Sequence, residues 1–220
     1  MARRIGGAEG FDSNKKNRKQ IKRVKEIRVI RKSILVACEG TKTERLYLED
    51  IFTSLKYQHK IAAGSLVIAK HNHTDPKGVL KDLLDHTDYE SFSYKWIVID
   101  RDIERTKGAG HSANDFNAAL AKAKSKGIEV AYSNPCFEIW YLLRLEYRNT
   151  AIDRTELQSK LEDEFNYQKN ILFKHGTEKE AIANAKKLLS SYDSDDPANN
   201  NPSTNVHELI TILRGFCLKN

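Results

Sequence analysis

The stretch Trp96–Glu104 constrains the fold of this chain more than any other. Its apolar start, W-I-V-I, runs directly into Asp100, Arg101 and Asp102. A continuous apolar run rich in β-branched residues is typical of a strand buried on both faces of a parallel sheet. Open α/β sheets bind ligands beyond the carboxyl ends of such strands, where these two carboxylates lie. Taken alone, the stretch fits either a solvated acidic turn or a cation site.

Further apolar runs alternate with amphipathic segments over the first two thirds of the chain. The expected strands cover residues 33–38, 65–70, 96–100 and 128–132, and the expected helices lie near 44–55, 79–84, 112–126 and 136–145. Strands that alternate with helices predict an α/β fold with a mostly parallel, four-stranded sheet and helices on both faces. Beyond about residue 149 the pattern is helical only.

Capping-box patterns mark the starts of three of the expected helices. They pair Thr41 with Glu44, Asp153 with Glu156, and Thr177 with Glu180. In such a box the first side chain accepts a hydrogen bond from a backbone N–H of the first helical turn. Together with the strand pattern, they predict an α/β domain at 33–148 and a helical C-terminal extension at 149–220 that packs on it.

Positive charge is concentrated at the N-terminus. Residues 1–32 contain 12 lysines or arginines and three acids, a net +9 in a chain whose total is +7, so the other 188 residues sum to −2. The first 20 residues show no periodicity, and we expect a partly disordered basic arm at 1–32. Such arms often contact nucleic-acid phosphates, although a solubilising tail fits the same composition.

Several protein classes are disfavoured by the composition. No apolar run approaches the roughly 20 residues that cross a bilayer, and the charged N-terminus lacks the apolar centre of a signal peptide. Three scattered cysteines without a C-x-x-C pair argue against a disulfide framework and a zinc ribbon. We therefore expect a cytoplasmic chain with reduced thiols and no membrane partner.

Acidic residues follow two of the expected strands. Glu39 comes directly after the first strand, and Asp100 and Asp102 come after the third. Because the carboxyl ends of parallel strands meet at one edge of a sheet, we expect these three side chains to converge. Hard divalent cations prefer such oxygen ligands, and a cation held there can act on a phosphate.

The motifs around these acids resemble those of a known family. Glu39-Gly40 and Asp100-Arg101-Asp102, each after an apolar strand, resemble the Toprim domain of topoisomerases, primases and overcoming-lysogenization-defect nucleases. Four longer motifs are similar to those of the RloB family. They are C-E-G-T-K-T-E at 38–44, I-D-R-D at 99–102, S-N-P-C-F-E-I-W at 133–140 and N-P-S-T-N-V at 201–206.

The resemblance implies an activity and partners. RloB-like proteins are small Toprim-like factors of bacterial defence loci, often encoded beside an AAA-type ATPase called RloA. The resemblance implies a nuclease that uses Mg²⁺ or Mn²⁺ and acts in antiphage defence by abortive infection. Its substrate would be RNA, with tRNA as one candidate, or DNA, and its control would come from an RloA-like ATPase. The sequence does not indicate an oligomeric state.

Residue roles follow from the chemistry and the resemblance. Asp100 and Asp102 are expected to bind the metal, and Glu39 is expected to be a further ligand or a general acid/base. Glu44 either only caps its helix or adds to the metal site, and Glu138 is expected to belong to the catalytic site. Basic residues expected to contact nucleic acid are Lys42, Arg101, Arg105, Lys15, Lys16, Arg18, Lys19, Lys22 and Arg23.

Histidines offer weaker candidates. His71 and His73 alternate at a strand end, but the sequence supplies no third or fourth ligand spaced to complete a zinc site with them. His111 lies nine residues after Asp102 and could donate a proton there.

Two other functions remain open. A haloacid-dehalogenase-type phosphatase also places a D-x-D after a strand, with the first Asp as nucleophile, but on its first strand. A catalytically inactive Toprim-like module could instead bind nucleic acid or an ATPase and regulate it. Three converging carboxylates argue against an idle site, because they repel one another unless a cation neutralises them.

Deleting residues 1–20 tests the arm. The truncation removes six basic residues, so nucleic-acid affinity should fall and the slope of its logarithm against the logarithm of salt concentration should flatten. Binding titrations at several salt concentrations measure both quantities. Equal affinity and slope with and without these residues would reduce the arm to a solubilising tail.

Overall fold

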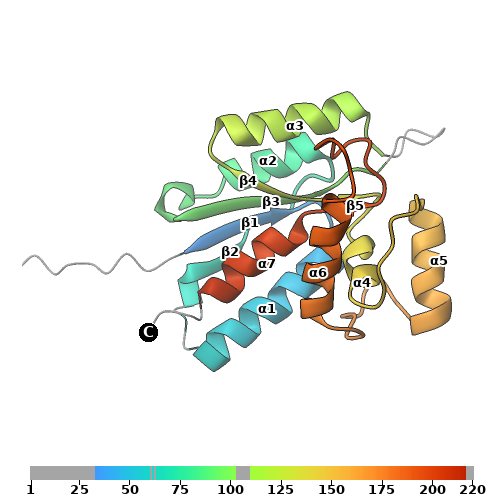
Figure 1. Cartoon of the computed structure of the whole chain (residues 1–220). Helices are drawn as coiled ribbons and strands as arrows, with labels where there is room; N and C mark the ends of the chain where they lie inside the picture. The colour runs from blue at the N-terminus through green and yellow to red at the C-terminus, as the bar shows by residue number, and fades with distance from the viewer. Residues whose placement is uncertain (1–32, 60, 62, 103–109, 217–220) are drawn as a thin grey trace, which may run out of the picture. The chain divides into compact units, whose positions relative to one another are not determined.

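A five-stranded sheet organises the computed structural model of the chain (Figure 1). The structure describes residues 33–59, 61, 63–102 and 110–216. The strands are β1 Ile34–Cys38, β2 Leu66–Ile68, β3 Tyr94–Asp100, β4 Glu129–Asn134 and β5 Ser203–Thr204. They lie in the order β2-β1-β3-β4-β5, and only the last pair is antiparallel. The three strands β1, β3 and β4 therefore point their carboxyl ends toward the same edge.

Helices cover both faces of this sheet (Figure 1). The α-helices are α1 Thr43–His59, α2 Pro76–Leu84, α3 Ala113–Ser125, α4 Glu138–Leu143, α5 Arg154–Phe165, α6 Glu178–Leu189 and α7 Val206–Gly215. Short 3-10 helices at Ala63–Ser65 and Tyr89–Ser91 precede β2 and β3. Within the residues described, no helix is both long and apolar enough to cross a membrane.

The two faces of the sheet carry two separate hydrophobic cores. Leu35, Ile97 and Ile99 face α2 and α3, whereas Val36 and Val98 face the side on which α1 and α7 pack. Alternate residues of β1 and β3 thus enter opposite cores, and all five are at most 1% exposed. This double burial explains the continuous apolar runs in the sequence.

The expected α/β, Toprim-like architecture is confirmed, with one addition. A fifth strand, β5, pairs antiparallel with β4 through Ser133↔Thr204 and Asn134↔Ser203. The expectation of helices only after residue 149 was therefore wrong at this point. Two residues are too few to produce an alternating pattern, so hydropathy could not reveal this strand.

The N-P-S-T-N-V motif closes the outer edge of β4. Beyond β5, the side chain of Asn205 continues the hydrogen bonding to the backbone of β4. Its Oδ1 accepts from the Tyr132 N–H at 2.7 Å, and its Nδ2 donates to the Val130 carbonyl at 2.8 Å. Thr204 Oγ1 adds a hydrogen bond to the Tyr132 carbonyl. The motif therefore has a structural role, since it satisfies edge groups that would otherwise lack partners.

The N-cap hydrogen bonds of two of the three predicted capping boxes are present. Asp153 accepts from the Glu156 N–H at the start of α5, and Thr177 accepts from the Glu180 N–H at the start of α6. The pairing of Thr41 with Glu44 was wrong, because α1 begins at Thr43 rather than one residue after Thr41. Glu44 is consequently inside the first turn of α1 and faces a pocket.

Replacing Asn205 tests its role at the sheet edge. Asn205→Ala leaves the Tyr132 N–H and the Val130 carbonyl without their partners, so the free energy of unfolding should fall by about 1–3 kcal/mol. Urea unfolding measures the change, with Asn199→Ala, an exposed asparagine of the preceding loop, as the control. Equal stability of the two variants would contradict the proposed role of Asn205.

Candidate active site

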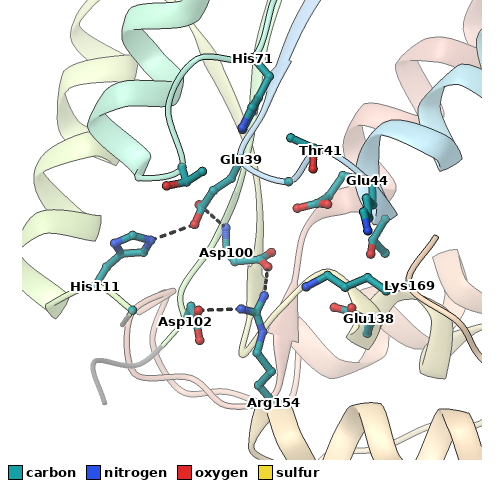
Figure 2. A pocket seen from close by; sticks show the side chains of 15 residues that line it. Glu39, Thr41, Glu44, His71, Asp100, Asp102, His111, Glu138, Arg154 and Lys169 are labelled. Carbon is teal, nitrogen blue, oxygen red and sulfur yellow. Dashed lines mark hydrogen bonds and ion pairs between the residues drawn. The ribbon is translucent and has the colours of Figure 1, made fainter. Parts of the chain in front are cut away.

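A pocket of about 450 Å³ opens at the carboxyl edge of β1 and β3 (Figure 2). Its walls come from the loops after β1, β2 and β3, from α4 and α5, and from the loop after α5. The acidic residues that line it are Glu39, Glu44, Asp100, Asp102 and Glu138. The other lining residues with polar side chains are Thr41, Lys42, Thr43, His71, Thr74, His111, Arg154 and Lys169. The structure thus brings together all five acids that the sequence nominated.

Glu39 is positioned by the pairing of β1 with β3. Cys38 pairs with Val98, and the next backbone group, the Glu39 N–H, donates to the Val98 carbonyl at 3.0 Å. Glu39 Oε2 then accepts from the Asp100 N–H at 3.1 Å, while Oε1 lies 2.8 Å from His111 Nε2. Both carboxylate oxygens of Glu39 are therefore oriented, one by the end of β3 and one by the start of the segment leading to α3.

Asp100 and Asp102 share one cation, the guanidinium of Arg154. Arg154 Nη2 donates to Asp100 Oδ2 at 2.7 Å, and Nη1 donates to Asp102 Oδ2 at 2.6 Å (Figure 2). Asp102 has a positive φ of 20°, and its N–H donates to the Pro135 carbonyl at 3.0 Å. The chain therefore turns sharply after β3, and both carboxylates reach the same arginine.

Negative charge exceeds positive charge around Asp100. Its side chain is 5% exposed, and its Oδ1 atom is buried without a hydrogen-bond donor among the described residues. Burial and the nearby charges of Glu44 and Glu39 hold the pKa of Asp100 well above its usual range, although Arg154 acts in the opposite direction. One arginine therefore does not fully compensate this carboxylate.

Glu44 is the second carboxylate with a raised pKa. Burial in the first turn of α1, together with the charges of Glu138 and Glu39, raises its pKa from 4.5 to about 7. Gly40 permits this position, because a Cβ at residue 40 would lie 2.0 Å from Glu44 Oε2. The glycine after Glu39 thus leaves space for a second acid.

Glu138, the first residue of α4, remains ionised through its hydrogen bonds. Its Oε1 accepts from the Tyr167 hydroxyl at 2.7 Å and from Gln158 Nε2 at 3.0 Å. Burial raises the pKa of Glu138, but the hydrogen bonds from Tyr167 and Cys136 outweigh it, and the pKa lies below its ordinary value. Glu138 is 1% exposed, so it supplies a fixed negative charge at the pocket wall.

His111 joins the site through Glu39. Its backbone N–H donates to the Asp102 carbonyl at 2.8 Å, and its ring bonds Glu39. The hydrogen bond to Glu39 raises the pKa of His111, against the effect of burial. His111 can therefore exchange a proton with Glu39 within the pocket.

The donor set fits a hard divalent cation such as Mg²⁺ in its chemistry. It consists of carboxylate oxygens, and it includes Oδ1 of Asp100, which is buried and has no hydrogen-bond partner among the described residues. Within the described residues, no three His, Cys, Asp or Glu side chains form a group that could hold a metal ion by themselves. Mg²⁺ commonly binds through only one or two carboxylates, with waters and substrate phosphates completing its coordination, so an open arrangement suits it.

The basic residues that the sequence suggested for nucleic-acid contact lie in different places. Lys42 lines the pocket. Arg101 does not: it is 6% exposed, and its guanidinium donates to the carbonyls of Ala198 and His111, at 2.9 Å and 2.6 Å. Arg105 and the residues of the N-terminal arm, namely Lys15, Lys16, Arg18, Lys19, Lys22 and Arg23, lie outside the described residues.

The loop histidines have structural partners. His71 Nδ1 lies 3.2 Å from the Cys38 carbonyl, and His73 Nδ1 lies 2.6 Å from Asp82 Oδ1. Asp82 also accepts from the backbone of Asn72, so the loop after β2 is organised around this carboxylate. His73 is consequently directed at α2 rather than at a zinc site shared with His71.

Sequence reasoning missed the contribution of α5 and the loop after it. Arg154 and Gln158 lie one helical turn apart and bond Asp100, Asp102 and Glu138. Lys169 points into the pocket from the following loop (Figure 2). The capping box at Asp153 fixed where α5 begins, but no local pattern indicates which of its residues face the sheet edge.

Comparison with known proteins identifies one relationship. A family model described as RloB-like protein matches residues 34–213. Comparisons with curated proteins and with solved structures give no significant match. The matched range extends from β1 into α7, and it includes all five acids of the pocket.

The raised pKa of Glu44 predicts how stability depends on pH. Between pH 4.5 and about 7, the folded chain holds a proton on Glu44 that the unfolded chain releases. Rising pH over this window should lower the free energy of unfolding, by up to roughly 3 kcal/mol from this group. Glu44→Gln removes this contribution, so it should lose less stability than the unsubstituted chain between about pH 5 and about pH 8.

Urea unfolding at the two pH values measures this difference. Glu49→Gln, on an exposed part of the same helix, is the matched control and should follow the unsubstituted chain. An unchanged pH dependence in Glu44→Gln would show that Glu44 does not titrate in this window.

Proposed function

The chain belongs to the RloB-like protein family, and we propose that it is a metal-dependent nuclease of the Toprim type. The observation that carries this proposal is the convergence of five carboxylates on one pocket at the carboxyl edge of the sheet. Burying like charges together costs stability unless a cation or a proton compensates them. Asp100 Oδ1 has no partner among the described residues, and the pKa of Glu44 is raised; both indicate that the protein's own cations compensate these charges only in part.

The acids take different roles in this proposal. Asp100, Asp102 and Glu39 would hold Mg²⁺ or Mn²⁺, and Glu44, which lines the same pocket, would add a ligand. When bound, the cation supplies charge stabilisation at the scissile phosphate and lowers the pKa of a coordinated water. The adjacent Glu138, held ionised by Tyr167 and Gln158, keeps the pocket negative and so favours a cation there.

Proton transfer is assigned to Glu39, supported by His111. Glu39 Oε1 lies 2.8 Å from His111 Nε2, within the distance needed for direct transfer. Since the Asp100 N–H holds the other oxygen, the carboxylate cannot rotate freely. Glu39 would move a proton to or from the reacting oxygens, and His111 would stabilise its charged form.

Cations at the pocket mouth suit an anionic substrate. Lys42 and Lys169 both line the pocket and are exposed. They would contact phosphates of the nucleic acid on either side of the scissile bond, with the basic arm at 1–32 adding sequence-independent affinity. The substrate is proposed to be RNA, with tRNA as one candidate, or DNA.

Family membership suggests the biological setting. The proposal includes a role in bacterial antiphage defence by abortive infection, under the control of an RloA-like AAA or ABC-type ATPase. The ATPase would have to relieve or impose restraint on the nuclease, since an unrestrained nuclease would damage its own cell.

A catalytically inactive regulator is the second candidate, and one observation favours it. Arg154 already bridges Asp100 and Asp102, which would let the acids serve as a structural ion pair in a module that binds nucleic acid or an ATPase. The phosphatase alternative is weaker, because its nucleophile would be Asp100, whose Oδ2 is ion-paired and whose Oδ1 is buried.

Cleavage assays with a charge-removing variant test the proposal. The full-length protein is incubated with tRNA, other RNA, single-stranded DNA and duplex DNA, in Mg²⁺ or Mn²⁺, with and without the partner ATPase. Asp100→Asn should lower cleavage by about 100-fold or more, the scale of losing a group that stabilises charge in the transition state. Asp163→Asn, an exposed acid on α5, is the control and should retain activity.

Two outcomes would count against the nuclease. Cleavage that Asp100→Asn leaves unchanged would exclude this pocket as its source. Binding of nucleic acid without cleavage of any substrate, even with the ATPase present, would favour the regulator.

A further inference from the structure

Arg154 is the first residue of α5, and its position is fixed from both sides. Asp153 caps the helix by accepting from the Glu156 N–H, which sets where the first turn begins. At the other end of the side chain, the two terminal nitrogens bond two different carboxylates, at 2.6 Å and 2.7 Å. The planar guanidinium fork matches this two-point contact, which a single ammonium group could not reproduce.

The backbones of both aspartates are held without this arginine. The backbone N–H of Asp100 is held by Glu39, and Asp102 is held by backbone hydrogen bonds to Pro135 and His111. Removing the guanidinium would therefore leave these backbone positions in place while it removes a positive charge from the two carboxylates.

A divalent cation at these carboxylates would lie within a few ångströms of the guanidinium. Coulomb repulsion between the two positive groups is strong at such distances, because the site is largely screened from water. The guanidinium also bonds Oδ2 of both aspartates, which leaves fewer carboxylate oxygens for a metal ion. Arg154 and the cation therefore compete for the same negative charge.

We propose that Arg154 is the residue that sets the affinity of the Asp100–Asp102 pair for divalent cations, acting as an internal competitor of the metal. This inference rests on the proposed metal-dependent function. It gives Arg154 a positioning and affinity-setting role rather than a catalytic one, and it adds α5 to the machinery of the site.

Manganese binding tests the inference without an activity assay. Full-length protein is titrated with Mn²⁺, and free Mn²⁺ is followed by electron paramagnetic resonance. Arg154→Gln should bind Mn²⁺ at least about tenfold more tightly, because the repelling charge is gone. Arg148→Gln is a closely matched control: Arg148 is 21% exposed against 22% for Arg154, and it pairs with Glu156 outside the pocket.

Thermal unfolding gives a second readout. Without added Mn²⁺, Arg154→Gln should melt at a lower temperature than the unsubstituted chain, because the two ion pairs of Arg154 with the aspartates are lost. Saturating Mn²⁺ should restore the melting temperature, since the metal replaces the lost charge. A residue with a purely structural role would give the first effect without the second.

Additional variants distinguish failure of the proposed competition from failure of the proposed metal site. Arg154→Lys keeps the charge but loses the two-point contact, so its Mn²⁺ affinity should lie between those of the unsubstituted chain and Arg154→Gln, and it carries the test if Arg154→Gln does not fold. Equal or weaker Mn²⁺ binding by Arg154→Gln, with binding still abolished by Asp100→Asn, would overturn the competition and leave the metal site standing. If neither the unsubstituted chain nor Arg154→Gln bound Mn²⁺, the metal-dependent function would fail as well.

Discussion

The parallel pairing of β1 with β3 decides where the acids of the pocket lie. This register places the backbone of Glu39 against Val98 and brings the Glu39 carboxylate to the Asp100 N–H. A shift by one residue would exchange the two faces of the strand and place the side chains of one core in the other, which is shaped for different residues. The burial of both faces therefore fixes the register, and the register fixes the geometry of the acids.

The buried carboxylates of the pocket are only partly compensated by the rest of the protein. Each buried carboxylate is compensated in a different way. Asp102 Oδ2 and Asp100 Oδ2 bond Arg154, Glu138 accepts hydrogen bonds, and Glu44 has a raised pKa. None of these solutions removes the excess negative charge around Asp100. Such partial compensation is unusual for a purely structural cluster, where each buried charge normally has a full set of partners, and it is common where a ligand supplies the remainder.

Much of the fold and part of the site could be predicted from the sequence. The apolar runs located β1 and β3, and parallel pairing then implied that Glu39, Asp100 and Asp102 converge. The contribution of Arg154 could not be predicted, because it depends on how α5 packs against a sheet edge more than 50 residues earlier in the chain. Arg101 illustrates the opposite problem: adjacency to the acids suggested phosphate contact, whereas alternation along the chain directs its side chain to Ala198.

One feature of α5 links the two sides of the pocket. Arg154 bonds the aspartates that follow β3, while Gln158, one turn later, bonds Glu138 of α4. Because a helix moves as a rigid rod, a displacement of α5 would withdraw both side chains together and leave three carboxylates without these donors. A protein that bound the outer face of α5 and displaced the helix would thereby change the charge of the pocket without contacting the pocket itself.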